Sequence, residues 1–453
     1  MAEELVLKGT VCAMGTPVNK AEMIVTSSRD KSVQIETVTK ISDLPVNLVE
    51  EILSRVPLKY MREVRLTCKE WDSLSKSRSF SKMRIDKLST VKEGESLMIA
   101  MMDYNLYLTR VVLGGTDEDP FVECQGRLTC LDKQIKISEF FHCDGLLLCV
   151  LRDDLTKYIV WNPYLGQTRS IEARDSHLPD ICPWTWFKYG LGYEDKGSSC
   201  RGYKLLRSID IYYDNRPTHQ CSCYEIYDFD SSTWKTLDIT PNWYILSYPG
   251  GVSIKGNTYW PASQSRKEDL PQDHIICFDF KSESFGPLMR LPFDAKHADD
   301  VTLSCVREEK LAVLLTRNEA GLLEFETMEY EIWISNKIEA EKVSWTKFLT
   351  VETGLYLLSA SSSFFIDEEK KVAMSYYKTF NIVGEDGYLK MLKLGECLGG
   401  TDRNCSLNVW SYVPSLVQIK QPAVRGKRKQ HKDLEAQVDM ISKEEMLVSV
   451  NKA

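Results

Sequence analysis

The sequence predicts an α+β multidomain protein in which a small three-helix unit precedes a large all-β domain. Apolar residues recur at helical spacing near the start of the chain, whereas short aromatic segments alternate with turn residues after about residue 95. The 453 residues also exceed what a single hydrophobic core usually serves. We expect a flexible leader at 1–38, the helical unit at 39–86, a linker at 87–95, the β domain at 96–420 and a basic, charged tail at 421–453.

Composition and charge narrow the class of protein. With 43% apolar and 27% charged residues the composition is globular, and the net charge of −8 argues against a nucleic-acid partner bound through a broadly basic surface. Residues 1–20 lack the basic start and apolar run of a signal peptide, and no window holds the roughly 18 apolar residues of a membrane span. We therefore expect a protein of the nucleus and/or cytoplasm, with reduced cysteines and no membrane partner.

The first predicted helix lies in "LPVNLVEEILSRVP", residues 44–57. A proline is tolerated in the first turn of a helix, as at Pro45, and Pro57 ends the helix by restricting Val56. One face of this helix is apolar, and it carries Leu48, Val49, Ile52, Leu53 and Val56.

Two further short helices complete the predicted unit. The second begins after Pro57, and the third carries Val64, Cys68, Trp71 and Leu74 at spacings of four, three and three. Three helices in about 40 residues bury too little apolar surface to be robust alone. We expect this unit to complete its core against a partner.

The β domain is predicted from strands such as "LLLCVL", "KYIVWN", "HIICFDF" and "KLAVLL", which are separated by Gly, Asp, Asn and Ser. An apolar strand, a polar turn and an aromatic strand recur at intervals of about 50 to 70 residues, near the kelch period of roughly 50. Glycine-pair kelch signatures are missing. The sequence favours a degenerate kelch-like β-propeller, with a β-sandwich as the alternative. We expect the aromatic residues Trp161, Trp234, Trp260, Trp333 and Trp345 to pack in its core.

Catalytic and metal motifs are scarce. The chain has no Gly-x-Ser-x-Gly elbow, phosphate loop, paired-histidine zinc helix or dinucleotide fingerprint. His219, Cys221 and Cys223 in "HQCSC" have no second ligand pair at a zinc-site spacing. His142 and Cys143 are adjacent on a predicted strand and should point to opposite faces, and the acidic runs at 117–120 and 367–371 are typical of solvated turns. We expect no cofactor and no catalysis.

These segments carry a family resemblance. "LPVNLVEEILSRVPLKYMREVRLTCKEWDSL" resembles the F-box, and "HCDGLLLCVLRDDLTKYIVWNPYLGQTRSI", "GVSIKGNTYW" and "FDFKSESFGPLMRLPF" resemble the plant F-box-associated type 1 domain. The resemblance implies the substrate-recognition subunit of a Skp/cullin/F-box ubiquitin ligase, a non-catalytic adaptor that binds an unknown target protein for ubiquitination. Its partners would be a Skp-type adaptor and, through it, cullin.

The resemblance also implies which residues contact the adaptor. The candidates are Leu44, Pro45, Leu48, Ile52, Leu53, Val56, Pro57 and Leu58, while Cys68 and Trp71 would be internal. Periodicity alone favours a different interpretation, in which the apolar face of the first helix is the core of some helical hairpin.

A basic run lies beyond the predicted β domain, in "VRGKRKQHK". It holds Arg425, Lys427, Arg428, Lys429 and Lys432. A nuclear-import signal, a nucleic-acid arm and a solvated tail all fit this composition.

Two alternative functions stay open at this point. The first is an F-box scaffold or competitor that acts outside a ligase. The second is a β-propeller enzyme with a pocket at the blade centre, for which the sequence offers neither a metal constellation nor an activated nucleophile.

Overall fold

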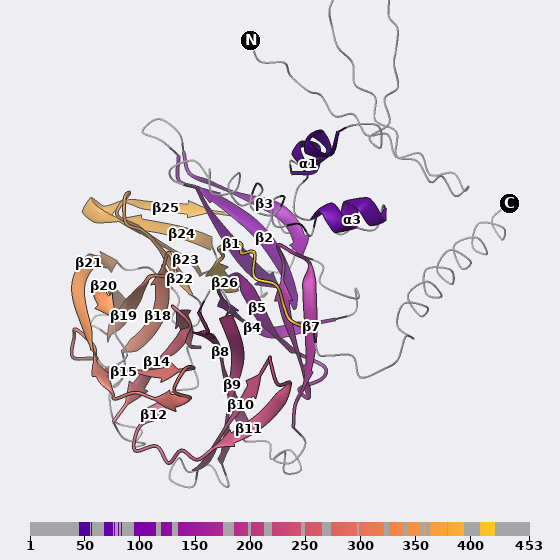
Figure 1. Ribbon diagram of the computed structural model, residues 1–453. Coiled ribbons are helices and arrows are strands. Elements are labelled where there is room, and N and C mark those ends of the chain that lie inside the picture. The colour runs from indigo at the N-terminus through magenta and orange to yellow at the C-terminus, as the bar shows by residue number, and fades with distance from the viewer. Residues whose placement is uncertain are drawn as a thin grey trace, which may run out of the picture.

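The computed structural model describes most of the chain between residues 45 and 421 (Figure 1). The described ranges are 45–54, 56, 68–75, 77, 80, 83, 95–114, 119–128, 135–174, 185–197, 201–212, 220–245, 250–264, 273–296, 299–320, 326–338, 342–353, 355, 357–358, 363–377, 379–393 and 408–421.

Two α-helices have their bounds within the described residues, α1 (Val46–Ser54) and α3 (Lys69–Ser75). The carbonyl oxygen of Pro45 accepts hydrogen bonds from the amides of Leu48 and Val49, at 2.9 and 3.1 Å, which places Pro45 at the start of α1 as predicted. The predicted second helix falls on residues 57–67, outside the described residues. The predicted count of three helices is therefore not confirmed.

The β domain is a propeller of six antiparallel sheets, which we call blades 1 to 6 in chain order (Figure 1). Blade 1 contains β1 (Glu95–Met102), β2 (Asn105–Val112), β3 (Phe121–Leu128) and β26 (Asn408–Ser411). Blade 2 contains β4 (Ile137–Cys143), β5 (Leu146–Leu151), β6 (Lys157–Asn162) and β7 (Gln167–Glu172). Blade 3 contains β8 (Thr185–Asp195), β9 (Arg201–Tyr212), β10 (Gln220–Asp228) and β11 (Thr233–Leu237).

Blade 4 is the least regular blade, and it contains β12 (Tyr244–Ile245), β13 (Val252–Ile254), β14 (Asn257–Ser263), β15 (His274–Asp279), β16 (Ser284–Phe285) and β17 (Met289–Arg290). Blade 5 contains β18 (Asp300–Val306), β19 (Lys310–Ala320), β20 (Glu326–Ile338) and β21 (Val343–Thr353). Blade 6 contains β22 (Phe364–Asp367), β23 (Val372–Tyr377), β24 (Thr379–Gly384) and β25 (Leu389–Leu392). The short 3₁₀ turn η5 (Glu385–Gly387) connects β24 to β25. Six sheets joined in a ring exclude the β-sandwich alternative.

The ring closes by pairing the two ends of the β domain. Strand β26 pairs antiparallel with β1, with Met98 opposite Ser411 and Ile99 opposite Trp410. Such closure removes a free sheet edge that could otherwise pair with another chain. It also ties the fold of the first blade to residues more than 300 positions later in the sequence.

The chain then continues as a C-terminal strap, residues 413–421, across blade 2. The side-chain amide of Asn162 donates to the carbonyl oxygens of Ser415 and Val417, at 3.1 and 2.8 Å, and Gln167 Oε1 accepts from the amide of Ile419 at 2.9 Å. A Cβ on Gly145, whose φ is +72°, would lie 2.4 Å from Ser415 Cβ. Only glycine allows this approach of the strap.

The hydrophobic core is divided into six apolar clusters, one between each pair of neighbouring blades. Trp161 and Trp260 are buried in two of these clusters, and Trp234, Trp333 and Trp345 pack against others while partly buried. The prediction that these tryptophans pack in the core is confirmed. The cysteines whose side chains the structure describes are all free thiols, as expected of reduced cysteines.

Candidate functional site

The helical unit has a small apolar interior. Val49, Leu53 and Phe80 form its buried cluster, with Leu53 only 2% exposed. Val56, Trp71 and Leu74 pack against this cluster while partly buried. The predicted internal position of Trp71 agrees with this packing.

The same helix exposes apolar side chains on another face. Val46 is 66% exposed and Leu48 is 45% exposed, Pro45 is also exposed, and Ile52 is half-buried. Exposed apolar side chains on so small a helical unit are consistent with a protein interaction site. Val46 was not among the predicted contact residues, although an apolar residue in the first turn of a short helix has few neighbours that can cover it.

One predicted contact residue needs correction. Leu53 was predicted to face the adaptor, but its side chain packs inside the unit against Val49 and Phe80. The helical period marks side chains that avoid water and does not separate those packed within the unit from those left for a partner. The remaining candidates Leu44, Pro57 and Leu58, and the basic residues Arg425, Lys427, Arg428, Lys429 and Lys432, lie outside the described residues.

The propeller has a cavity of about 240 Å³ on its axis. The residues that line it come from β4, β8, β18 and β26 and from the segments that lead into β13 and β22, so all six blades contribute. Its walls include Phe187, Trp186 and Trp410, and its polar side chains include Glu139 and Lys188. A cavity at the meeting point of several elements is a common place for ligand binding.

Glu139 and Lys188 differ in how their charges are balanced. The ammonium of Lys188 forms a buried ion pair with Asp210, whose other carboxylate oxygen accepts a hydrogen bond from Ser222 at 2.6 Å. Glu139 has no hydrogen-bond or ion-pair partner among the described residues, and the surrounding walls raise the pKa of its carboxyl by desolvation. No sequence motif marks Glu139 in "KISEFFHC", because its neighbours come from other blades.

A second polar group lies at the carboxyl ends of the inner strands. His142 Nε2 accepts a hydrogen bond from the amide of Gly145 at 3.2 Å and lies 3.4 Å from Glu308 Oε1. Burial lowers the pKa of His142 to about 4 and raises the pKa of Glu308 to about 7. The Asp144 carboxylate beside them binds both Arg201 and the hydroxyl of Tyr203.

The neighbouring Cys143 points away from this group. Its side chain belongs to the apolar cluster between blades 2 and 3, whereas the ring of His142 lies 5.5 Å from that of Tyr412, which follows β26. Burial also raises the pKa of the Cys143 thiol. His142 and Cys143 point to opposite faces of the strand, as predicted, and do not form a nucleophilic pair.

Metal-binding groups were also sought in the part of the chain that the structure describes. Within it, no three His, Cys, Asp or Glu residues are placed to hold a metal ion. His219 lies outside the described residues, as does the side chain of Cys221. No described helix has the length and apolar character needed to cross a membrane.

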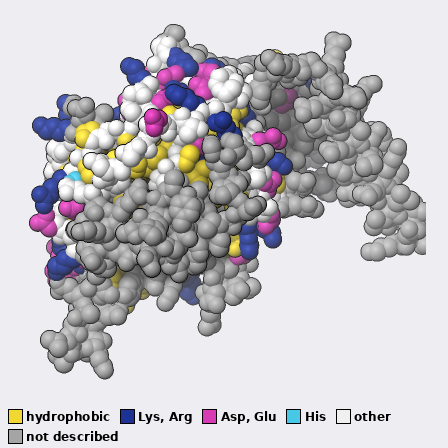
Figure 2. Space-filling view, turned by 90° about the horizontal axis from the view of Figure 1, so that it is seen from below, with side chains coloured by type: hydrophobic (Ala, Val, Ile, Leu, Met, Phe, Trp, Pro, Cys, Tyr) yellow, Lys and Arg dark blue, Asp and Glu magenta, His cyan; other side chains and the backbone are white. Residues whose placement is uncertain are grey.

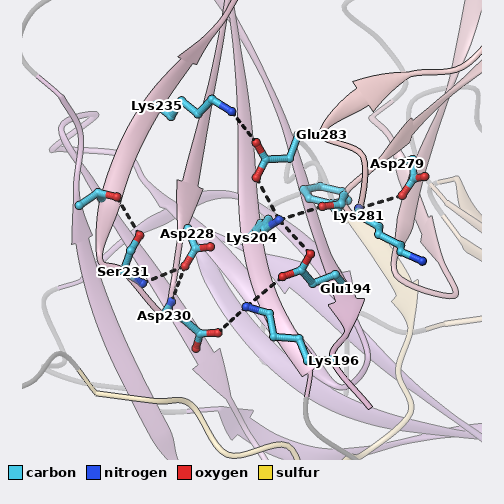
Figure 3. Close-up of polar contacts among 12 residues, drawn as sticks. Glu194, Lys196, Lys204, Asp228, Asp230, Ser231, Lys235, Asp279, Lys281 and Glu283 are labelled. Atoms are coloured by element: carbon cyan, nitrogen blue, oxygen red, sulfur yellow. Dashed lines mark hydrogen bonds and ion pairs between the residues drawn. The ribbon is translucent and has the colours of Figure 1, made fainter.

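Charged side chains connect blades 3 and 4 on the outer part of the ring (Figure 3). The ammonium of Lys204 lies 3.0 Å from Glu283 of the β15–β16 turn and 3.3 Å from Glu194 of β8. Lys196 joins Glu194 to Asp230, each at 2.9 Å, and Asp230 also binds Lys420 of the C-terminal strap at 2.7 Å. This network fastens the strap and the two blades, and it leaves no group free for chemistry.

The described acidic run at 367–371 is a turn, as predicted. Asp367 Oδ1 accepts hydrogen bonds from the amides of Glu369 and Lys370, at 3.0 and 2.9 Å. Seen from below, basic and acidic side chains are interspersed around the edge of the described surface (Figure 2).

Comparisons with known proteins agree with this architecture. Residues 97–419 match the family described as the F-box associated beta propeller domain, and residues 41–83 match the F-box domain. An F-box/kelch-repeat protein of Arabidopsis thaliana is 49% identical over 419 residues, which cover 87% of this chain and 93% of that protein. An F-box protein of the same plant is 50% identical over 418 residues, with 88% and 95% covered.

Among solved structures, a polysaccharide lyase that acts on ulvan aligns with 64% of this chain and 77% of its own. The TM-score of 0.32 and the identity of 8% are too low to bear on fold or function.

Proposed function

Because this chain belongs to the plant F-box proteins that carry an F-box associated β-propeller domain, we propose that it is the substrate-recognition subunit of a Skp/cullin/F-box ubiquitin ligase. In this proposal the helical unit docks on a Skp-type adaptor, which brings cullin, and the propeller holds a target protein. The chain itself is a non-catalytic adaptor, and the ubiquitin-transferring enzyme is recruited elsewhere in the assembly.

The observation that carries the proposal is the exposed apolar surface of α1. Val46 and Leu48 leave large apolar areas in water, while the interior of the unit consists of only Val49, Leu53 and Phe80 with three partly buried neighbours. A unit this small gains stability when a partner covers its exposed face. The adaptor is the partner that an F-box implies.

The experiment measures the Kd of the full chain for a purified Skp-type adaptor. Truncating a side chain at the centre of an interface costs about 2 kcal/mol or more, so Leu48→Ala should raise Kd about thirtyfold. Leu355→Ala is the matched control, because Leu355 is 48% exposed but lies in the propeller. An unchanged Kd for Leu48→Ala, with the control also unchanged, would remove the basis for docking through α1.

A second measurement separates a ligase subunit from a scaffold or competitor. Co-purification of cullin with the chain and the adaptor supports the ligase role. Adaptor binding without cullin would instead favour the scaffold. We further propose that the protein acts in the nucleus and/or cytoplasm, with the basic run at 425–432 as an import signal, which a reporter fused to that segment would test.

A further inference from the structure

The axial cavity contains a carboxylate on the side that faces blade 3. Glu139 and Phe141 are two positions apart on β4, so their side chains lie on the same face of the strand. The ring of Phe141 lies 5.6 Å from that of Tyr189 on β8. Burial is the main cause that raises the pKa of Tyr189, and the negative charge of the nearby Glu139 carboxylate raises it further. Glu139 therefore lies beside the aromatic side chains of β8.

Several aromatic rings line the same cavity as this carboxylate. Phe187 stacks on Tyr189 with ring centroids 6.4 Å apart and an interplanar angle of 15°. Trp186 lines the cavity and is 43% exposed, and Trp410 lines it from β26 with its ring 4.2 Å from that of Phe140. Aromatic faces carry negative electrostatic potential and attract cations.

The charge of the cavity is not balanced from within. Lys188 is the nearest described cation in the lining, and the buried carboxylate of Asp210 already neutralises it. Glu139 is an exposed carboxyl in the cavity lining that no described cation pairs with, so it can attract a cation from outside. A volume of about 240 Å³ suits one long side chain better than a drug-sized molecule.

From this arrangement we propose that the axial cavity binds a basic side chain, lysine or arginine, that the target protein presents to the propeller. The inference rests on the proposed function, because a target held by the propeller is what would present the side chain. Glu139 pairs with the incoming cation, and Trp186 and Phe187 contact its aliphatic stem and its charged end.

The test uses the full chain in complex with the Skp-type adaptor. The probes are capped pentapeptides with Arg or Lys at the centre of four glycines, together with neutral counterparts that carry citrulline or norleucine. Kd is measured by calorimetry and by tryptophan fluorescence, since three tryptophans line the cavity. The cationic peptides should bind at least about tenfold more tightly than the neutral ones.

Two variants assign the effect to the cavity. Glu139→Gln should reduce the affinity for the cationic peptides to that for the neutral peptides, and Trp186→Ala should weaken it severalfold. Glu352→Gln is the matched control, because it removes one exposed carboxylate from the outer strand β21. Equal binding of cationic and neutral peptides, or an unchanged affinity in Glu139→Gln, would overturn the assignment.

The basic run at 425–432 is a competing occupant within this chain. A chain that ends at Gln421 should bind the cationic peptides as the full chain does. If the shortened chain binds the cationic peptides at least about tenfold more tightly than the full chain, the tail occupies the cavity. That result would overturn the proposal that a target protein occupies it. Adaptor binding is measured on the same samples. A chain that binds the adaptor but not the cationic peptides contradicts only the cavity proposal, whereas loss of adaptor binding contradicts the proposed function.

Discussion

The helical unit and the propeller differ in how completely they bury their apolar side chains. The described part of the helical unit buries three apolar side chains and leaves Val46 and Leu48 in water. The propeller distributes its apolar residues over six clusters and closes on itself through β26 and β1. Under the proposed function the helical unit gains stability from a partner, whereas the propeller buries its apolar residues between its own blades.

The two regions also differ in their buried charges. In blade 3 the guanidinium of Arg207 on β9 pairs with Glu225 on β10, with both side chains at most 1% exposed, and it donates a hydrogen bond to the hydroxyl of Tyr158 in blade 2 at 3.0 Å. The buried residues of the described helical unit include no charged side chain. A self-contained fold can hold such a charge because strands of the same blade and of a neighbouring blade supply partners for the guanidinium.

The largest expected effect comes from breaking that ion pair. Arg207→Met leaves the Glu225 charge buried without a partner, which should lower the free energy of unfolding of the propeller by about 3 to 5 kcal/mol. Arg290→Met, in an exposed pair with Asp294, should cost under about 1 kcal/mol. Urea denaturation of both variants measures the difference.

The double variant Arg207→Met with Glu225→Met provides the control. Because it removes both charges, it should recover most of the lost stability. If Arg207→Met is no less stable than Arg290→Met, the buried ion pair does not stabilise the propeller.

The second prediction tests the dependence of the helical unit on its partner. Leu53→Ala opens a cavity in its interior and should cost about 2 to 4 kcal/mol, which is comparable to the whole stability of so small a unit. Hydrogen exchange of the α1 amides should become fast in the free chain and slow again when the adaptor is saturating. Leu48→Ala, on the exposed face, should leave the exchange unchanged. Fast exchange in Leu48→Ala as well would place Leu48 in the interior.

The third prediction concerns Glu308, a partly buried acid in the turn between β18 and β19. Burial raises the pKa of Glu308 from 4.5 to about 7, so the folded state binds the proton more tightly than the unfolded state. Stability from this group is present below about pH 4.5 and is lost as the pH rises through 7. Glu308→Gln removes this dependence, and its gain in stability over the parent should grow from near zero at pH 4.5 to about 3 kcal/mol at pH 8.

The groups around Glu308 define the control for this measurement. His142, Asp144 and Arg201 face it, and the lowered pKa of His142 makes the fold lose stability as the pH falls below 6.5. That loss should be shared by parent and variant and cancel in their difference. A difference that does not change with pH would show that the carboxyl of Glu308 ionises as it does in water.

The smallest expected effect is that of a reducing agent. The described cysteines are free and several are buried, so reduction should leave the Tm of the propeller unchanged. A clear fall in Tm on reduction would mean that a disulfide stabilises the fold.

Much of this architecture could be predicted from local sequence. The helical period located α1, Pro45 marked its start, and the change to short aromatic strands predicted an all-β domain with its tryptophans inside. These features depend on residues close to one another in the chain, where periodicity and turn chemistry act directly.

The tertiary structure decided the rest. The closure of the ring follows from the pairing of β26 with β1, and the burial of Leu53 follows from its packing against Phe80. Glu139 lies in the cavity beside aromatic side chains of β8, a strand of another blade. A sequence pattern reports which side chains avoid water, but the partners that cover them or leave them unpaired come from distant parts of the chain, and only the folded ring brings those parts together.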